Sequence, residues 1–427
     1  MTHVPRTPRG EEASYDRERL RQWLAGQARA DGVSRRRLLT LLAAVPAAAG
    51  LPPVSRAAAT TPKAAGIVKP LPDSWFTVRG TNAETKWESL RGVGYHTPID
   101  RFFVRNHTST PVLDATTWRL KLWGSGLRGA PGVDRAVEFG LEELRAMPSV
   151  TRSAFVECAG NGRGYYATQQ GQTVTGTAWT LGAVGVARWR GVRLAEVLRR
   201  AGLTGTAVDV MPRGLDDEYV TDGVNLGRVR RPLPLAKALD DVVLAYEMNG
   251  EPLPYDHGYP VRVLVPGWVG ISSIKWVGDI EVSAEPLFSP WNTDFYRLFG
   301  PDHPDGGSPP LTRQTIKSAF ELAVGATFTA GRTHQLHGRS WSGAGGVRDV
   351  QVSTDGGATW RPARRRDAPR PDGWVRWSLP WRPSAPGPAE LLARATDTAG
   401  RSQPDQAVYN TQGYLFDAVV RHAVTVV

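Results

Sequence analysis

Glycine and proline interrupt this chain so often that long helices are disfavoured along most of it. Of 427 residues, 46 are Gly and 33 are Pro. Both residue types destabilise helix interiors and are frequent in turns, so the chain is expected to form many short strands rather than a helical bundle. Hydrophobic residues make up 41% and charged residues 22%, which excludes a wholly disordered chain and a polytopic membrane protein.

The N-terminal segment has the pattern of an export signal. Residues 34–40 read Ser-Arg-Arg-Arg-Leu-Leu-Thr, and an apolar run from 38 to 51 follows, interrupted by Pro46. Three alanines at 57–59 offer a small-residue cleavage site. We therefore expect residues 1–59 to be a twin-arginine signal and leader, with the mature protein in the periplasm, at the cell surface or outside the cell. A short buried helix with basic flanks is the alternative interpretation.

After the leader, the sequence pattern changes once, near residue 305. Before this point, helical periodicity alternates with apolar strand-like runs, which predicts a mixed α/β domain at 70–305. The expected helices lie at 140–147, 194–201 and 233–239, and the expected strands at 208–211, 242–246 and 261–265. Residues 303–310 read as a linker. The fold class is therefore α+β, with a second domain at 311–427.

Short alternating strands separated by turns predict that the second domain is an immunoglobulin-like β-sandwich. The expected strands lie at 334–337, 350–353, 374–379 and 391–395. The Arg/Pro-rich stretch 361–371 is expected to be a solvated hairpin loop, with a docking patch as the alternative.

Charge and cysteine content restrict the function. The net charge is +11, but the sequence has no stripe of Lys and Arg with interleaved aromatic residues, so we expect no nucleic-acid binding. An anionic substrate or an acidic partner explains the charge as well. Because the chain has one cysteine, it can form no internal disulfide, no Cys-rich zinc site and no covalent c-type haem site.

That cysteine, Cys158, ends an apolar strand and precedes a glycine-rich turn. Such a turn lets the backbone approach a ligand closely. Arg163, five residues later, could lower the pKa of the thiol or hold an anion. A lone cysteine at a strand end is also common as a small core residue, so the local pattern leaves both interpretations open.

Two further segments carry cationic groups. Strand alternation would place Phe103, Arg105 and His107 on one face, which suits an anion pocket or a surface strand. Between residues 256 and 276, a histidine, an arginine and a lysine fall at the ends of hydrophobic runs with glycines between them. This arrangement can bind phosphate without a Walker loop.

Together these segments resemble the sulfite oxidase family of molybdopterin-dependent oxidoreductases. The motifs Arg-Asn-His, Cys-Ala-Gly-Asn, His-Gly-Tyr-Pro-Val-Arg and Ile-Lys-Trp all occur in the order typical of that family. Residues 179–183, 246–250, 341–343 and 353–360 are also similar to it. The resemblance covers about residues 70–427. It implies a molybdopterin-binding catalytic domain at 70–305 and a dimerisation domain at 311–427, so a homodimer is expected.

The resemblance also implies residue roles. Cys158 would be the thiolate ligand of molybdenum, one cofactor per chain, and a soft thiolate suits that metal. The pyranopterin and its phosphate would be held by Phe103, Arg105, Asn106, His107, Asp216, His257, Arg262, Ser273 and Lys275. The substrate pocket would be lined by Arg105, Arg163, Trp179 and Tyr296. Core packing is the alternative role for Trp179 and Tyr296.

Two positions depart from the family pattern. Gly162 stands where relatives have the first of two adjacent arginines, and Gln412 stands where they have a late arginine. The pocket should therefore be less cationic than in vertebrate sulfite oxidases. No His-Pro-Gly-Gly haem segment is found, and we expect no haem, flavin or zinc.

The expected activity is oxidation of sulfite, or of a related sulfur compound, with electrons passed to an external acceptor such as cytochrome c. Reduction of a sulfoxide or another oxo-compound is the enzymatic alternative. A non-catalytic secreted binding module is the alternative from another class.

Overall fold

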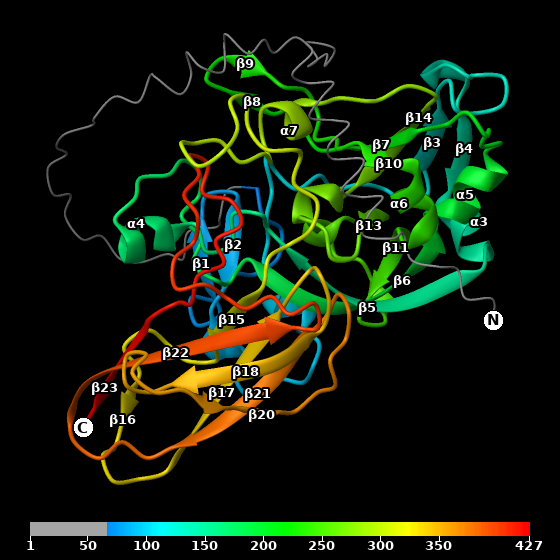
Figure 1. Cartoon of the computed structure of the whole chain (residues 1–427). Helices are drawn as coiled ribbons and strands as arrows, with labels where there is room; N and C mark the ends of the chain where they lie inside the picture. Colours follow the sequence, from blue (N-terminus) through cyan, green and yellow to red (C-terminus); the bar gives the residue numbers. More distant parts are fainter. Residues whose placement is uncertain (1–65) are drawn as a thin grey trace, which may run out of the picture.

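The computed structural model describes residues 66–427. The arginine motif, the apolar run and the alanine cleavage site fall outside the described residues, so the export signal stays a prediction. The described chain contains mostly strands and few helices, and a mixed part precedes a β-sandwich (Figure 1). The predicted α+β fold class is therefore confirmed. Within residues 66–427, no helix has both the length and the apolar character needed to cross a bilayer.

Two sheets form the framework of the mixed part. Their strands are β3 (Arg119–Trp123), β4 (Val137–Gly140), β5 (Ser149–Glu157), β6 (Val184–Arg193), β7 (Asp209–Gly214), β10 (Leu233–Pro234), β11 (Val243–Met248), β12 (Glu251–Pro252), β13 (Arg262–Leu264) and β14 (Val277–Ser283). One sheet has the order β10-β7-β14-β3-β4, and β14 pairs with β3 in parallel. The other has the order β12-β11-β6-β5, and β13 also pairs with β11.

Two small hairpins accompany these sheets, and short helices connect their strands. The hairpins are β1 (Phe76–Arg79) with β2 (Asn82–Thr85), and β8 (Val220–Thr221) with β9 (Val224–Asn225). The helices are α3 (Leu141–Ala146), α4 (Gly164–Gln170), α5 (Leu194–Arg200), α6 (Leu235–Asp240) and α7 (Pro290–Thr293). The three predicted helices correspond to α3, α5 and α6. The last begins later than predicted because Leu233 and Pro234 pair with β7.

The second part is a sandwich of two sheets. Its strands are β15 (Lys317–Phe320), β16 (Thr327–Phe328), β17 (His334–Trp341), β18 (Val347–Ser353), β19 (Arg361–Pro362), β20 (Arg364–Arg365), β21 (Trp374–Trp381), β22 (Gly387–Asp397) and β23 (His422–Val426). One sheet has the order β15-β17-β21-β20 and the other β16-β23-β22-β18-β19. Leu336, Val352, Trp377 and Leu391 pack in its buried core. The four predicted strands are present and longer than predicted. The stretch 361–371 is largely exposed and contributes two short edge strands.

A further hydrophobic cluster fills the junction between the two parts. It contains Phe155 of β5, Trp341 of β17 and Trp374 of β21. Trp87 stacks on Trp341 with ring centroids 5.7 Å apart. The sandwich therefore packs directly against the strand that ends before Cys158.

Candidate cofactor and substrate site

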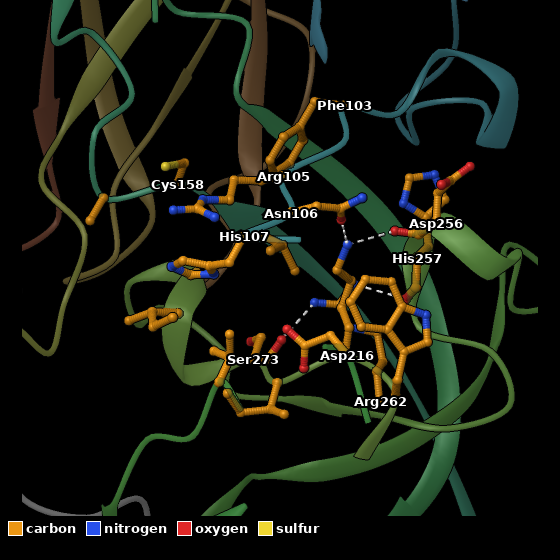
Figure 2. A pocket seen from close by; sticks show the side chains of 18 of the residues that line it. Phe103, Arg105, Asn106, His107, Cys158, Asp216, Asp256, His257, Arg262 and Ser273 are labelled. Carbon is orange, nitrogen blue, oxygen red and sulfur yellow. Dashed lines mark hydrogen bonds between the residues drawn. The ribbon is translucent and has the colours of Figure 1, made fainter. Parts of the chain in front are cut away.

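A cavity that is partly open to solvent lies in the mixed part, where several strands and loops end. Every residue predicted to bind the metal or the cofactor lines it, namely Phe103, Arg105, Asn106, His107, Cys158, Asp216, His257, Arg262, Ser273 and Lys275. Figure 2 shows that Cys158 and Arg105 lie toward one end, whereas His257 and Arg262 lie toward the other. The cavity therefore has a thiol end and a basic end.

The thiol end depends on the turn that follows β5. Cys158 is 9% exposed, and its N–H donates to the carbonyl of Ala183 at 3.0 Å. Asn161 closes the turn, because its N–H donates to the carbonyl of Cys158 at 2.9 Å. The Asn161 amide also donates to Glu157 and accepts from the N–H of Ala183, both at 2.9 Å. Gly162 has φ +93°, a conformation that residues with a side chain rarely adopt, so glycine is favoured at this position.

The basic end holds three cationic or ionisable groups, which are His257, Arg262 and Lys275. Burial lowers the pKa of Arg262 to about 9 and that of Lys275 well below its usual range, with Arg262 adding to the effect on Lys275. Burial also lowers the pKa of His257, whose Nε2 has no hydrogen-bond partner among the described residues. Burying such groups around a cavity is costly unless an anion pairs with them. This end is therefore suited to a phosphate.

Two carboxylates flank the basic groups. Burial raises the pKa of Asp216 to about 6, and its Oδ1 has no hydrogen-bond partner within the described chain. It can accept a hydrogen bond from a ligand N–H. Asp256, which the sequence interpretation missed, accepts the N–H groups of Val68 and Lys69 at 3.0 and 2.7 Å. In the sequence, the one feature that could have pointed to Asp256 as a site residue is its position directly before His257.

Asp256 and Asn106 together hold the ammonium group of Lys275 at the cavity wall. Nζ of Lys275 donates to the carbonyl oxygen of Asp256 at 2.8 Å and also to Oδ1 of Asn106. The same ammonium lies 4.1 Å from the ring centroid of Trp276. These contacts fix where the positive charge sits before a ligand binds.

Arg105 and Tyr296 lie near the thiol. Burial alone would lower the pKa of Arg105, but four neighbouring groups together raise it, namely Tyr296, Cys158, Tyr414 and Tyr219, so the guanidinium stays charged. Burial raises the pKa of Tyr296, so its phenol stays protonated at neutral pH and can donate a hydrogen bond. Tyr296 stacks on Tyr414 with centroids 5.0 Å apart, and its φ of +56° is unusual for a bulky residue. Such strain is concentrated at functional sites.

His107 is held as a neutral ring. Burial lowers its pKa well below the usual range, and Arg105 and Lys275 lower it further. Nε2 of His107 accepts a hydrogen bond from the indole N–H of Trp291 at 3.2 Å. Its proton therefore lies on Nδ1, which is left as a donor.

Arg163 and Trp179 do not line the cavity, although the sequence predicted them in the substrate pocket. Arg163 turns away, because it donates to the carbonyls of Gln412 and Thr177 at 2.8 and 3.1 Å. Its guanidinium lies 5.1 Å from the ring centroid of Tyr414, which stacks on Tyr296. Trp179 is buried in the hydrophobic cluster that contains Cys158. Both residues form a layer behind the wall, and their roles toward substrate stay predictions.

The geometry fits a long anionic ligand with a metal at one end. The orphaned Nε2 of His257 and Oδ1 of Asp216 offer hydrogen bonds, the buried Arg262 and the half-buried Lys275 offer charge, and Cys158 offers a soft ligand. Fold and site together define an oxidoreductase that binds molybdopterin.

Comparisons with known proteins agree with this class. Residues 107–291 match the family described as "Oxidoreductase molybdopterin binding domain", and residues 319–427 match the "Mo-co oxidoreductase dimerisation domain". The human mitochondrial sulfite oxidase is 38% identical over 360 residues, which span 80% of this chain and 63% of that protein. Sulfite oxidase of Arabidopsis thaliana is 30% identical over 358 residues, spanning 78% of this chain and 89% of that protein.

A solved structure is also similar over most of the chain. The sulfane dehydrogenase SoxCD from Paracoccus pantotrophus superposes with a TM-score of 0.70 at 27% identity, covering 87% of this chain and 93% of that one. The chain therefore belongs to the sulfite oxidase family, as its motifs predicted.

Proposed function

We propose that this protein oxidises sulfite, or a related sulfur compound, at a molybdenum-molybdopterin centre and passes the electrons to an external acceptor. The observation that carries the proposal is the shared cavity, in which the thiol of Cys158 and the guanidinium of Arg105 lie at one end and a buried basic cluster lies at the other. The sulfite oxidases and the sulfane dehydrogenase SoxCD named above support a sulfur substrate.

The cavity residues would hold the cofactor along its length. Cys158 would bind the metal through its thiolate. Lys275, Arg262 and His257 would pair with the phosphate, and the carboxylate of Asp216 would accept a hydrogen bond from the pterin. When bound, the molybdenum centre supplies two-electron oxygen transfer to sulfur. The balanced reaction takes sulfite and water to sulfate, two protons and two electrons.

Arg105 and Tyr296 would act on the substrate directly. The charged guanidinium of Arg105 attracts a sulfur oxyanion toward Cys158, and the protonated phenol of Tyr296 donates a hydrogen bond to one of its oxygens. Both groups are positioned in the cavity wall before substrate arrives, so little reorganisation is needed. Arg163 would contribute its charge from behind Tyr414.

The surroundings of the enzyme follow from the same proposal. Export by the twin-arginine route would carry the folded chain out of the cytoplasm, and cytochrome c is the proposed acceptor of two single electrons. The domain at 319–427 is proposed to pair two chains, each with one molybdopterin and without haem, flavin or zinc.

Reduction of a sulfoxide or another oxo-compound is a second candidate, and Gln412 is the observation that favours it. Gln412 is buried, donates to the carbonyl of Asp294 at 3.1 Å, and has an Oε1 without a partner among the described residues. Gln412 adds no positive charge beside Arg163. The missing charge would weaken the binding of a dianion more than the binding of a neutral substrate.

Steady-state turnover distinguishes the candidates. Molybdenum-loaded protein is assayed for reduction of cytochrome c by sulfite, and separately for consumption of a neutral sulfoxide by a dye donor. Turnover of sulfite supports the proposal, whereas turnover of the sulfoxide alone overturns it in favour of the reductase. A purified protein that carries no molybdenum after expression in a cofactor-producing host would favour a binding module.

A further inference from the structure

The carboxylate of Glu157, the residue before Cys158, is fully buried at the junction with the sandwich. One oxygen lies 2.9 Å from Nζ of Lys317 and accepts from the amide of Asn161 at 2.9 Å. The other oxygen accepts the indole N–H of Trp341 at 2.9 Å. Lys317 begins β15 and Trp341 ends β17, so the sandwich supplies two of the three groups that hold this carboxylate.

The same contacts fix the peptide that carries the thiol. Asn161, held by Glu157, donates its backbone N–H to the carbonyl of Cys158 at 2.9 Å. Gln314, which lies before β15, donates its amide to the carbonyl of Glu157 at 2.7 Å. A continuous set of hydrogen bonds therefore runs from the sandwich to both sides of Cys158.

Stability alone does not explain such an ion pair. Lys317 is 1% exposed, and removing two charges from water costs about as much as their attraction returns. Apolar residues of similar size would often serve a junction as well. A directional pair beside the thiol, by contrast, selects one backbone position.

We propose that Glu157 and Lys317 are positioning residues through which the sandwich fixes the sulfur of Cys158 toward the cavity. The inference rests on the proposed function in that Cys158 holds the metal. It gives the sandwich a role in the metal site beyond pairing two chains.

Thiol labelling of the cofactor-free, full-length chain tests this without substrate or metal. Because Cys158 is the only cysteine, the rate of its modification by N-ethylmaleimide, followed by mass spectrometry, reports this position alone. Glu157→Gln and Lys317→Met should each accelerate labelling about tenfold or more, because the loosened turn opens more often. If the substitutions acted only through charge, the two labelling rates would change in opposite directions. Glu157→Gln would accelerate labelling, because losing the carboxylate favours the thiolate, and Lys317→Met would slow it, because losing the ammonium disfavours the thiolate.

The chain offers a matched control. Glu321 and Arg339 form another buried ion pair, at 2.7 Å, and Arg339 also crosses the junction to the carbonyl of Leu90 at 3.2 Å. Glu321→Gln should lower the melting temperature comparably and leave the labelling rate within about twofold of wild type. Equal acceleration in this control, unchanged labelling in the test variants, or opposite directions for the two variants would each overturn the proposal.

A gentler variant keeps the test valid if a charge substitution prevents folding. Trp341→Phe keeps the aromatic packing and removes only the donor to Glu157, and it should accelerate labelling about threefold. In loaded enzyme the same variants should lower kcat and leave KM for sulfite within about twofold, because the turn and not Arg105 is disturbed. A chain that labels as predicted but does not oxidise sulfite would overturn the proposed function and leave the positioning role standing.

Discussion

Arg262 tests whether the basic end of the cavity is built for an anion. Within residues 66–427, its guanidinium donates only to backbone carbonyls, those of His257 at 3.1 Å, Ser273 at 3.0 Å and Val263 at 3.4 Å. Burial is what lowers its pKa from 12.5 to about 9. That fall corresponds to about 5 kcal/mol of destabilisation of the folded, cofactor-free protein by the buried charge. The destabilisation is fully present below pH 9 and disappears as the pH rises toward 12.5.

Arg262→Met should therefore affect the cofactor-free and loaded proteins differently. In the cofactor-free protein, relief of the buried charge opposes the lost hydrogen bonds, so the free energy of unfolding should change by less than about 2 kcal/mol. In the loaded protein, a bound phosphate has already offset the burial cost. The stability that the cofactor adds should fall by about 2–5 kcal/mol, with less molybdenum retained per chain.

Urea unfolding of both forms, together with metal analysis, measures these changes. Arg339→Met is the matched control, because Arg339 is also buried but has its own carboxylate, Glu321, at 2.7 Å. This control should lose about 3–5 kcal/mol in both forms. Equal losses in both forms for Arg262→Met would refute the anion-binding role.

Three other predictions concern substrate, pH and assembly. Gln412→Arg should lower KM for sulfite about five- to thirtyfold in steady-state assays and leave KM for a neutral sulfoxide unchanged, because the longer side chain brings a positive charge toward the cavity, whereas the neutral amide of Gln412 is bound to the carbonyl of Asp294; an unchanged KM for sulfite would contradict it. In cofactor-free protein, the raised pKa of Asp216 should make stability fall by up to about 3 kcal/mol as pH rises from 3.8 to 6, and Asp216→Asn should remove that part of the pH dependence in urea titrations. Sedimentation at micromolar concentration should show a dimer formed through residues 319–427, and a monomer would count against it.

The sequence predicted the cavity well because its residues belong to short motifs with fixed local geometry. Cys158 directly follows a strand, and His257 and Arg262 lie in one glycine-containing segment, so their types and order carried the information. Phe103, Arg105 and His107 also line the cavity, as predicted, but the strand alternation expected there does not form, because Phe102 and Asn106 line the same cavity.

The sequence could not predict contacts made across long separations. Arg163 follows the cysteine motif closely, but its direction is set by the carbonyl of Gln412, 249 residues later. Asp256 has its backbone N–H partners, Val68 and Lys69, near the start of the described chain. The contact between Glu157 and Lys317 required the sandwich to be packed against β5. Such directions depend on tertiary packing, which no local pattern contains.

X-ray absorption at molybdenum tests the central claim, that Cys158 binds the metal, most directly. Wild-type protein and Cys158→Ser are both loaded with cofactor, and the sulfur ligands of molybdenum are counted from the fine structure. We expect one sulfur ligand fewer in Cys158→Ser, with an unchanged melting temperature for the cofactor-free chain. An identical sulfur count in the two proteins would contradict it.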